Sequence, residues 1–314
     1  MGSKELEFSE FLSGGVQKIV ARAMVIANGD RRESRFFAEF MMSSAAASFK
    51  RSVRAANGEN IPPFLIAAIS GSCNLHCEGC YSRSNGYCSD CAKADELSAD
   101  DWKKIFSEAE SLGISFILVS GGEPLMRRDV LKVASQFRKI LFPIFTNGTL
   151  IDDKYLEMFL KCRNLLPVFS MEGEHDRTDS RRGEGVYESV KETMKKLCGA
   201  RVPFGASITV THENLQEVTS VEFVRSLQDD GCILVVYVEV VPVTENMRAL
   251  ALSDDDREYL KQRVDSLQEN NAQMIFLSFP VDEEKTGGWQ RLFPYRCERQ
   301  RTALPVLTLF RYEH

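Results

Sequence analysis

Long apolar runs are missing from this chain of 314 residues. No segment reaches the roughly 20 apolar residues that a helix needs to span a bilayer, and the first residues lack the apolar stretch of a secretory signal. Concentrated basic charge is missing as well, because the formal net charge is −6. A dominant nucleic-acid surface would need clustered lysine and arginine. We therefore expect neither a membrane nor a nucleic acid as a partner.

Cysteine is too scarce for a disulfide scaffold, since the chain has nine, or about 3%. Five of the nine fall between Cys73 and Cys91, which indicates a local metal site instead. Free thiols of this kind are typical of a reducing compartment, so we expect a cytoplasmic protein. With 44% hydrophobic and 27% charged residues, the chain is long enough for one large domain and an appendage.

The densest cysteine cluster is the stretch Cys73-Asn-Leu-His-Cys77-Glu-Gly-Cys80-Tyr81, which follows the apolar run 64–69. Thiolates are soft ligands that favour iron–sulfur clusters, zinc or Cu(I). Three cysteines on one short loop can hold three corners of a [4Fe–4S] cube, whose usual complement is four. The fourth iron would stay open, and an open position distinguishes a catalytic metal site from a structural one.

Zinc is the alternative interpretation of the same region. Cys77 and Cys80 form one C-x2-C pair, and Cys88 and Cys91 form a second, which is zinc-like spacing. A zinc-stapled, non-enzymatic α/β binding protein would use these four cysteines and leave Cys73 out. If the cluster interpretation holds, the second pair could instead ligate another metal, remain free thiols or, as we favour, form a lid without metal.

From residue 64 onward, apolar runs alternate with amphipathic segments. We expect strands at 64–69, 115–119, 142–146, 166–170, 204–211 and 233–241, and helices at about 98–112, 127–139, 152–163, 186–199, 214–229 and 254–271. The strands are apolar nearly throughout, as in a parallel sheet that is covered on both faces. Six such units predict an α/β fold, a partial (β/α)6 TIM-type barrel with its active site at the carboxyl ends of the strands. A seventh run, 274–278, is a candidate edge strand.

The remaining segments lie outside this alternation. Residues 1–58 contain no strand-like run and predict two helices, at 11–27 and 36–49, which form an N-terminal helical extension. Residues 59–280 make up the barrel core, and residues 281–314 form an irregular tail. We therefore expect three parts, of which the middle one carries the chemistry.

The second predicted strand runs into Ser120-Gly121-Gly122-Glu123-Pro124. Two glycines let a backbone approach a ligand closely. Glu123 offers a carboxylate to an ammonium group, and Pro124 stiffens the turn. Taken alone, this segment is equally typical of an ordinary turn between a strand and a helix.

In order and on successive strands, the two motifs resemble the signature of the radical S-adenosylmethionine (SAM) superfamily. The Cys-Tyr ending is similar to that of the branch with the molybdenum-cofactor cyclase, the peptide-modifying SPASM enzymes and haem-biosynthesis relatives. The resemblance implies the same partial barrel. It also implies that Cys73, Cys77 and Cys80 ligate a [4Fe–4S] cluster whose open iron chelates SAM. The residues Gly121, Gly122, Glu123 and Pro124 would then hold the SAM amino group.

Four further positions match the family by their place in the chain. Asn147 belongs to a T-N-G turn after the third strand, which the resemblance puts near the ribose of SAM. Ser170 and Glu172 lie in Ser-Met-Glu-Gly, similar to the S-[IL]-[DE]-G pattern. The resemblance implies Ser170 at the carboxylate or ribose of SAM, and Glu172 at the ribose or at substrate. Ser207 on the fifth strand is a candidate SAM contact. By residue type alone, Asn-Gly is a turn signal and Glu172 is equally a helix cap.

Two more pairs have open roles. Arg181 and Arg182 precede a glycine where the family often has an R-G segment that contacts substrate or SAM. Tyr237 and Glu239 share one face of the sixth strand, which points either into the barrel or towards packed helices.

The resemblance implies a radical SAM enzyme. A reduced cluster would cleave SAM to methionine and a 5'-deoxyadenosyl radical, which abstracts hydrogen from a peptide or a small molecule. A flavodoxin or ferredoxin would act as the reductant. Many members of this branch continue into a cysteine-rich module with auxiliary clusters, and Cys297 alone cannot complete one. Because a one-base shift can read a Cys-Pro-Phe segment here, our hypothesis is that residues 281–314 are a frameshifted remnant of such a module.

Overall fold

The structure, a computed structural model, describes residues 31–59, 61–92 and 96–279. The predicted helix 11–27 and the tail with Cys297 lie outside these residues, as does the frameshift hypothesis. The division into three parts remains a prediction.

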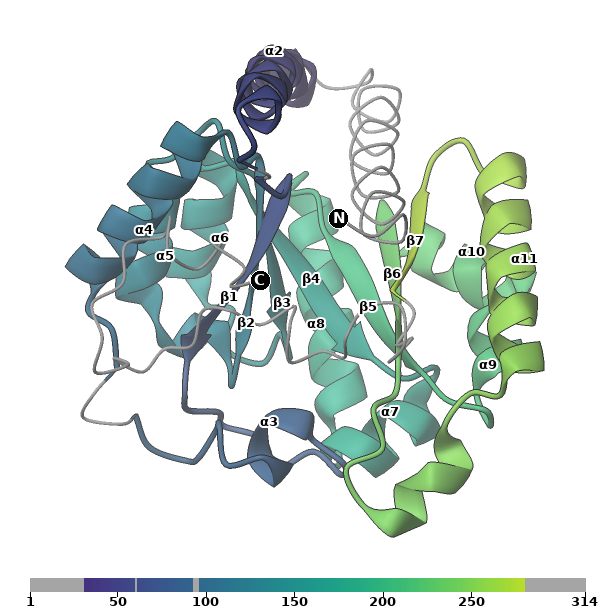
Figure 1. Cartoon of the computed structure of the whole chain (residues 1–314). Helices are drawn as coiled ribbons and strands as arrows, with labels where there is room; N and C mark the ends of the chain where they lie inside the picture. The colour runs from purple at the N-terminus through teal and green to yellow at the C-terminus, as the bar shows by residue number, and fades with distance from the viewer. Residues whose placement is uncertain (1–30, 60, 93–95, 280–314) are drawn as a thin grey trace.

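Seven parallel strands form one sheet in the described part of the chain, in the order β1 to β7 (Figure 1). They are β1 (Phe64–Ser70), β2 (Phe116–Gly121), β3 (Phe142–Thr146), β4 (Leu165–Met171), β5 (Gly205–Val210), β6 (Leu234–Glu239) and β7 (Ile275–Phe279). Each strand pairs with the next one along the chain, and the sheet curves into an open half-barrel. This confirms the predicted fold class, with the seventh run present as the edge strand.

Helices between the strands cover the outer face of the sheet (Figure 1). The helices that follow the predicted pattern are α4 (Ala99–Leu112), α5 (Arg128–Ala134), α6 (Asp153–Lys161), α8 (Val186–Gly199), α10 (Val221–Asp229) and α11 (Asp254–Asn270). Further short helices are α3 (Tyr81–Ser84), α7 (His175–Arg182), α9 (Leu215–Val218) and the 3-10 helices η1 (Pro124–Met126) and η2 (Glu245–Leu250). Among the described residues, no helix combines the length and apolar character needed to cross a bilayer.

Two predicted helices are shorter than their periodicity suggested. The helix expected at 127–139 ends at Ala134, where the side-chain amide of Asn164 donates to the Ala134 carbonyl at 3.1 Å. The helix expected at 214–229 is divided into α9 and α10, because the Ser220 hydroxyl accepts a backbone N–H and caps a new helix. In both places a polar side chain satisfies backbone groups that a longer helix would have paired internally.

The helix α2 (Arg31–Ala56) closes the barrel at the amino ends of the strands (Figure 1). Two of its aromatic side chains enter the interior, where Phe37 packs with Leu166 and Leu234, and Phe40 with Phe116. The predicted helix at 36–49 is therefore present within a longer one. The opposite end of the barrel, at the carboxyl ends of the strands, is left to polar segments.

Candidate active site

The cysteine loop, residues 71–92, leaves the carboxyl end of β1 and folds back on itself. The N–H of Cys73 donates to the carbonyl of Ser89 at 3.0 Å, and the N–H of Ser89 donates to the carbonyl of Gly71 at 2.9 Å. Cys73, Cys77 and Cys80 are each half-buried. The three thiols thus lie at the edge of the barrel where the alternation of strands and helices predicted an active site.

Hydrogen bonding and burial act differently on these thiols. The hydrogen bond with Cys88 lowers the pKa of Cys73 to about 6, and the positive charges of Arg83 and Arg182 act in the same direction against burial. Burial raises the pKa of Cys77, and the positive charge of Arg182 offsets only part of this rise. The Cys73 thiol is therefore easier to deprotonate than an ordinary cysteine, and the thiolate is the form that binds metal.

The glycine turn after β2 lies directly against this loop. The N–H of Gly122 donates to the carbonyl of Ser70 and the N–H of Glu123 donates to that of Ser72, both at 2.7 Å. A β-carbon on Gly121 would overlap the carbonyl oxygen of Ser70, and one on Gly122 would overlap that of Ser72. Glycine is needed at both positions because two backbone segments meet there without room for a side chain.

Glu123 is only 1% exposed and connects this turn to the end of β3. Its Oε1 accepts from the Thr146 hydroxyl at 2.7 Å and from the Leu125 N–H at 2.9 Å, and its Oε2 accepts from the Asn147 N–H at 2.8 Å. Burial raises the pKa of Glu123 to about 7 in spite of these bonds. Both oxygens are engaged within the protein, so the carboxylate positions the β3 turn; its contact with SAM remains a prediction.

Asn147 joins the β3 turn to the cysteine loop. Its Nδ2 donates to Oδ1 of Asn74 at 2.9 Å, and Nδ2 of Asn74 donates to the Thr149 hydroxyl at 2.9 Å. The Thr149 hydroxyl donates to Oδ1 of Asn147 at 2.8 Å, which completes a ring of three side chains. The sequence did not indicate the parts of Asn74 and Thr149, because the ring joins segments that are more than 70 residues apart.

Hydroxyl side chains line the interior of the barrel near the carboxyl ends of the strands. Val168 on β4 packs in the same interior cluster as Phe37. Ser170 lies two residues further along β4, so its side chain is on the same face of the strand. Ser170 also pairs in register with Ser207 on β5. On β2, the Ser120 hydroxyl is buried and has no hydrogen-bond partner in the described part of the chain. A buried polar group without a partner is costly, so this hydroxyl is suited to a ligand.

Tyr237 and Glu239 turn away from the interior, towards the helices. The Tyr237 hydroxyl donates to the carbonyl of Val218 at 2.9 Å. Glu239 accepts from Nε and Nη2 of Arg257 at 2.8 and 2.6 Å. The sequence left two orientations possible for these side chains, and the structure shows that they point towards the packed helices.

Glu172 follows β4 and accepts from both arginines at the end of α7. The bonds are 3.0 Å from Arg181 and 2.7 and 2.6 Å from Arg182. The helix α7 was not predicted, because its segment is polar and buries only Thr178. The predicted site residues on β1, β2, β3, β4 and β5 thus all lie at one end of the sheet.

The second cysteine pair does not complete a zinc site here. Within residues 31–59, 61–92 and 96–279, no group of three or more His, Cys, Asp or Glu side chains converges to hold one metal ion. Cys88 is buried beside Cys73, whereas Cys91 is exposed. A [4Fe–4S] cube does not require convergence on one point, since each thiolate binds a different iron. The donor set and the unpartnered Ser120 hydroxyl therefore fit a cluster and SAM better than zinc.

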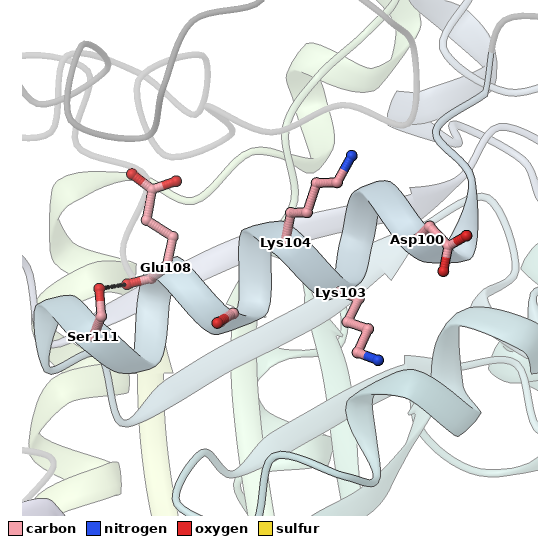
Figure 2. Close-up of a pocket in the computed structure, with 6 residues that line it drawn as sticks. Asp100, Lys103, Lys104, Glu108 and Ser111 are labelled. Atoms are coloured by element: carbon pink, nitrogen blue, oxygen red, sulfur yellow. Dashed lines mark hydrogen bonds between the residues drawn. The ribbon is translucent and has the colours of Figure 1, made fainter.

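A shallow hollow on the outer face of α4 lies away from these residues (Figure 2). Asp100, Lys103, Lys104 and Glu108 line it, and their side chains point in different directions. The only bond drawn among them joins the Ser111 hydroxyl to the carbonyl of Glu108, at 2.7 Å. The hollow lies on the solvated face of an amphipathic helix, and we assign no function to it.

An open parallel barrel with a cysteine loop and a glycine turn on adjacent strand ends is typical of α/β proteins that bind a cofactor at the carboxyl ends of their strands. Residues 68–224, half of the chain, match the model of the Radical SAM superfamily. The chain therefore belongs to this superfamily. Membership implies SAM and an iron–sulfur cluster as cofactors.

Two curated relatives with different names illustrate the range of proteins that the chain resembles. The chain is 31% identical over 167 residues to the AdoMet-dependent heme synthase of Methanosarcina barkeri, which covers 51% of this chain and 46% of the relative. It is 26% identical over 166 residues to the sporulation killing factor maturation protein SkfB of Bacillus subtilis, which covers 51% and 39%. The matched part is thus less than half the length of these relatives.

Among solved structures, SuiB of Streptococcus suis has the same fold. Its complex with SAM matches with a TM-score of 0.60 at 20% identity, over 70% of this chain and 51% of that one. Its complex with the precursor peptide SuiA matches with a TM-score of 0.58 at 16% identity, over 84% and 60%. The matches extend the likeness beyond the region of the family model.

Proposed function

We propose that this chain cleaves SAM reductively at a [4Fe–4S] cluster held by Cys73, Cys77 and Cys80. When bound and reduced, such a cluster supplies the electron that splits SAM into methionine and a 5'-deoxyadenosyl radical, which abstracts hydrogen from the substrate. The observation that carries the proposal is the direct backbone contact between the cysteine loop and the glycine turn, through Glu123 N–H and the Ser72 carbonyl.

The protein's own part is to bind and orient SAM and to keep water out. The backbone of Gly121, Gly122 and Pro124 would receive the amino group of SAM. The Ser120, Ser170 and Ser207 hydroxyls would contact its carboxylate or ribose, together with Asn147. The buried Ser120 hydroxyl supports this, because a ligand would provide the partner that it lacks.

The segment η2 covers the cysteine loop from the side of β6. Met247 packs so closely on Gly79 that a β-carbon at Gly79 would overlap its thioether. Met247 is buried, so the contact shields the loop from water at Gly79. A dry pocket protects a radical from side reactions with solvent.

The substrate is a peptide or a small molecule, and the reductant is a flavodoxin or ferredoxin. Relatives support each substrate class: SuiB binds a precursor peptide, and another relative is named a PqqA peptide cyclase, whereas the first relative is named a heme synthase. Substrate trials should therefore include both peptides and tetrapyrroles.

Anaerobic reconstitution with iron and sulfide tests the proposal. We expect a brown protein with about four irons and four sulfides per chain, whose visible absorbance bleaches with dithionite. Incubation with SAM and dithionite should release 5'-deoxyadenosine. Cys73→Ala should abolish the colour, and Cys91→Ala, the matched control, should keep it.

The zinc alternative gives the opposite pattern. It predicts a colourless protein with one zinc, which Cys91→Ala removes and Cys73→Ala leaves in place. That result would overturn the proposed function.

A further inference from the structure

The Glu172 carboxylate is fully engaged by the protein. It is 4% exposed, and three guanidinium N–H groups from Arg181 and Arg182 bond its two oxygens at 2.6 to 3.0 Å. The side chain of Asn214 also holds the Glu172 carbonyl, at 2.7 Å. A ribose hydroxyl could reach this carboxylate only by competing with charge-assisted bonds, which are the strong ones in proteins.

From Glu172 the contacts continue to the cysteine loop. Nε of Arg181 donates to the carbonyl of Glu78 at 3.1 Å, and the N–H of Glu78 donates to the carbonyl of Arg181 at 2.7 Å. Glu78 stands between Cys77 and Cys80. The middle of the cysteine loop is thus held by α7, and the end of α7 is held by β4.

Arg182 brings a positive charge to the same place. Its side chain is mostly buried, and although burial alone would lower the pKa of Arg182, its attraction to Glu172 outweighs that effect and raises it. Cys77 and Cys80 lie within reach of its charge. Two guanidiniums and one carboxylate leave one net positive charge beside the loop.

We infer that Glu172 is a positioning residue, which holds Arg181 and Arg182 so that they anchor the cysteine loop and set the charge beside it. The inference rests on the proposed function, because it takes this loop to hold the cluster. It assigns Glu172 a different part from the predicted contact with ribose. Partners of this kind around metal ligands orient the ligands and tune the metal.

The chain contains a matched control for this group. Glu239 also ends a strand, is 3% exposed and accepts two bonds from one arginine, Arg257. That pair lies on the helix side of β6, and its bonds join β6 to α11. Glu239→Gln therefore repeats the chemical change of Glu172→Gln away from the proposed cluster.

The first measurement is the rate at which a chelator removes iron from the reconstituted protein without SAM. We expect Glu172→Gln to lose iron about tenfold faster than the unmodified protein, because the loop loses its anchor. Glu239→Gln should release iron at the unmodified rate. A residue that serves only as a ribose ligand would weaken SAM binding and leave this rate unchanged.

The second measurement is the midpoint potential of the cluster. If the variants only loosened the fold, they would not shift this potential in opposite directions. Removing the negative charge in Glu172→Gln should raise the potential, and removing the positive charge in Arg182→Gln should lower it. The controls Glu239→Gln and Arg257→Gln should leave it in place. If Glu172→Gln does not fold, the contrast between Arg182→Gln and Arg257→Gln decides.

The failures of the two ideas are distinguishable. A protein that takes up no cluster overturns both the proposed function and this inference. A cluster that forms normally, with iron release and potential unchanged in Glu172→Gln and Arg182→Gln, overturns the inference alone.

Discussion

The two ends of the barrel are built from different residues. At the amino end, Phe37 and Phe40 of α2 fill the interior with apolar side chains. At the carboxyl end, the interior has Ser120, Ser170 and Ser207, and glycines replace side chains where the strands meet the cysteine loop. The amino end therefore contributes to the stability of the fold, whereas the carboxyl end has a buried hydroxyl without a partner and close backbone contacts, as we expect of a ligand site.

The largest expected effect follows from filling the contact at the carboxyl end. In Gly122→Ala the new methyl group overlaps the Ser72 carbonyl, so the glycine turn must separate from the cysteine loop. We expect a loss of about 3 kcal/mol or more in unfolding free energy and a loss of cluster binding. Urea unfolding measures the loss of unfolding free energy, and the iron content after reconstitution measures cluster binding.

Gly199→Ala is the matched control, because open space surrounds the added methyl group at the end of α8. It should bind the cluster normally and be as stable as the unmodified protein or slightly more so. Normal cluster content in Gly122→Ala would show that the contact is not required.

The next effect belongs to the amino end. Phe40 is 1% exposed, and Phe40→Ala should cost about 3–5 kcal/mol of unfolding free energy by leaving a cavity. Phe49, on the same helix but 71% exposed, should tolerate alanine within about 0.5 kcal/mol. Where Phe40→Ala remains folded, the rate of iron release should not change. Faster iron release from Phe40→Ala would show that packing at the amino end affects the cysteine loop at the carboxyl end.

A smaller effect is the pH dependence that Glu123 gives the carboxyl end. Burial raises its pKa from 4.5 to about 7, so the folded state favours the protonated form. Its contribution to stability is present below about pH 4.5 and is lost as the pH rises through 7, by about 3 kcal/mol in total. Glu123→Gln removes this loss. The difference in unfolding free energy between the two proteins should therefore change from pH 4.5 to 7.5; a constant difference would contradict the account.

Much of the barrel could be predicted from the sequence, because parallel strands that are buried on both faces form continuous apolar runs. The run 142–146 matches β3 to the residue, and the other strands agree within one or two. The helix α7 was missed because its polar segment lacks an apolar stripe. Its end is held by Glu172, a few residues before it, and by Glu78, about 100 residues away in the sequence.

The candidate site was predictable in its motifs and not in its contacts. Spacing indicated that Cys73, Cys77 and Cys80 act together, and order along the strands placed Gly121 and Gly122 beside them. Spacing could not indicate that Glu123 bonds the β3 turn, because the partners become neighbours only when the sheet forms.

The central claim is that an iron without a protein ligand lies beside the glycine turn and binds SAM. Electron paramagnetic resonance of the dithionite-reduced protein, recorded with and without SAM, tests it most directly and does not require turnover. We predict that SAM changes the signal of the reduced cluster in the unmodified protein and in Cys91→Ala. An identical spectrum with and without SAM would contradict the claim.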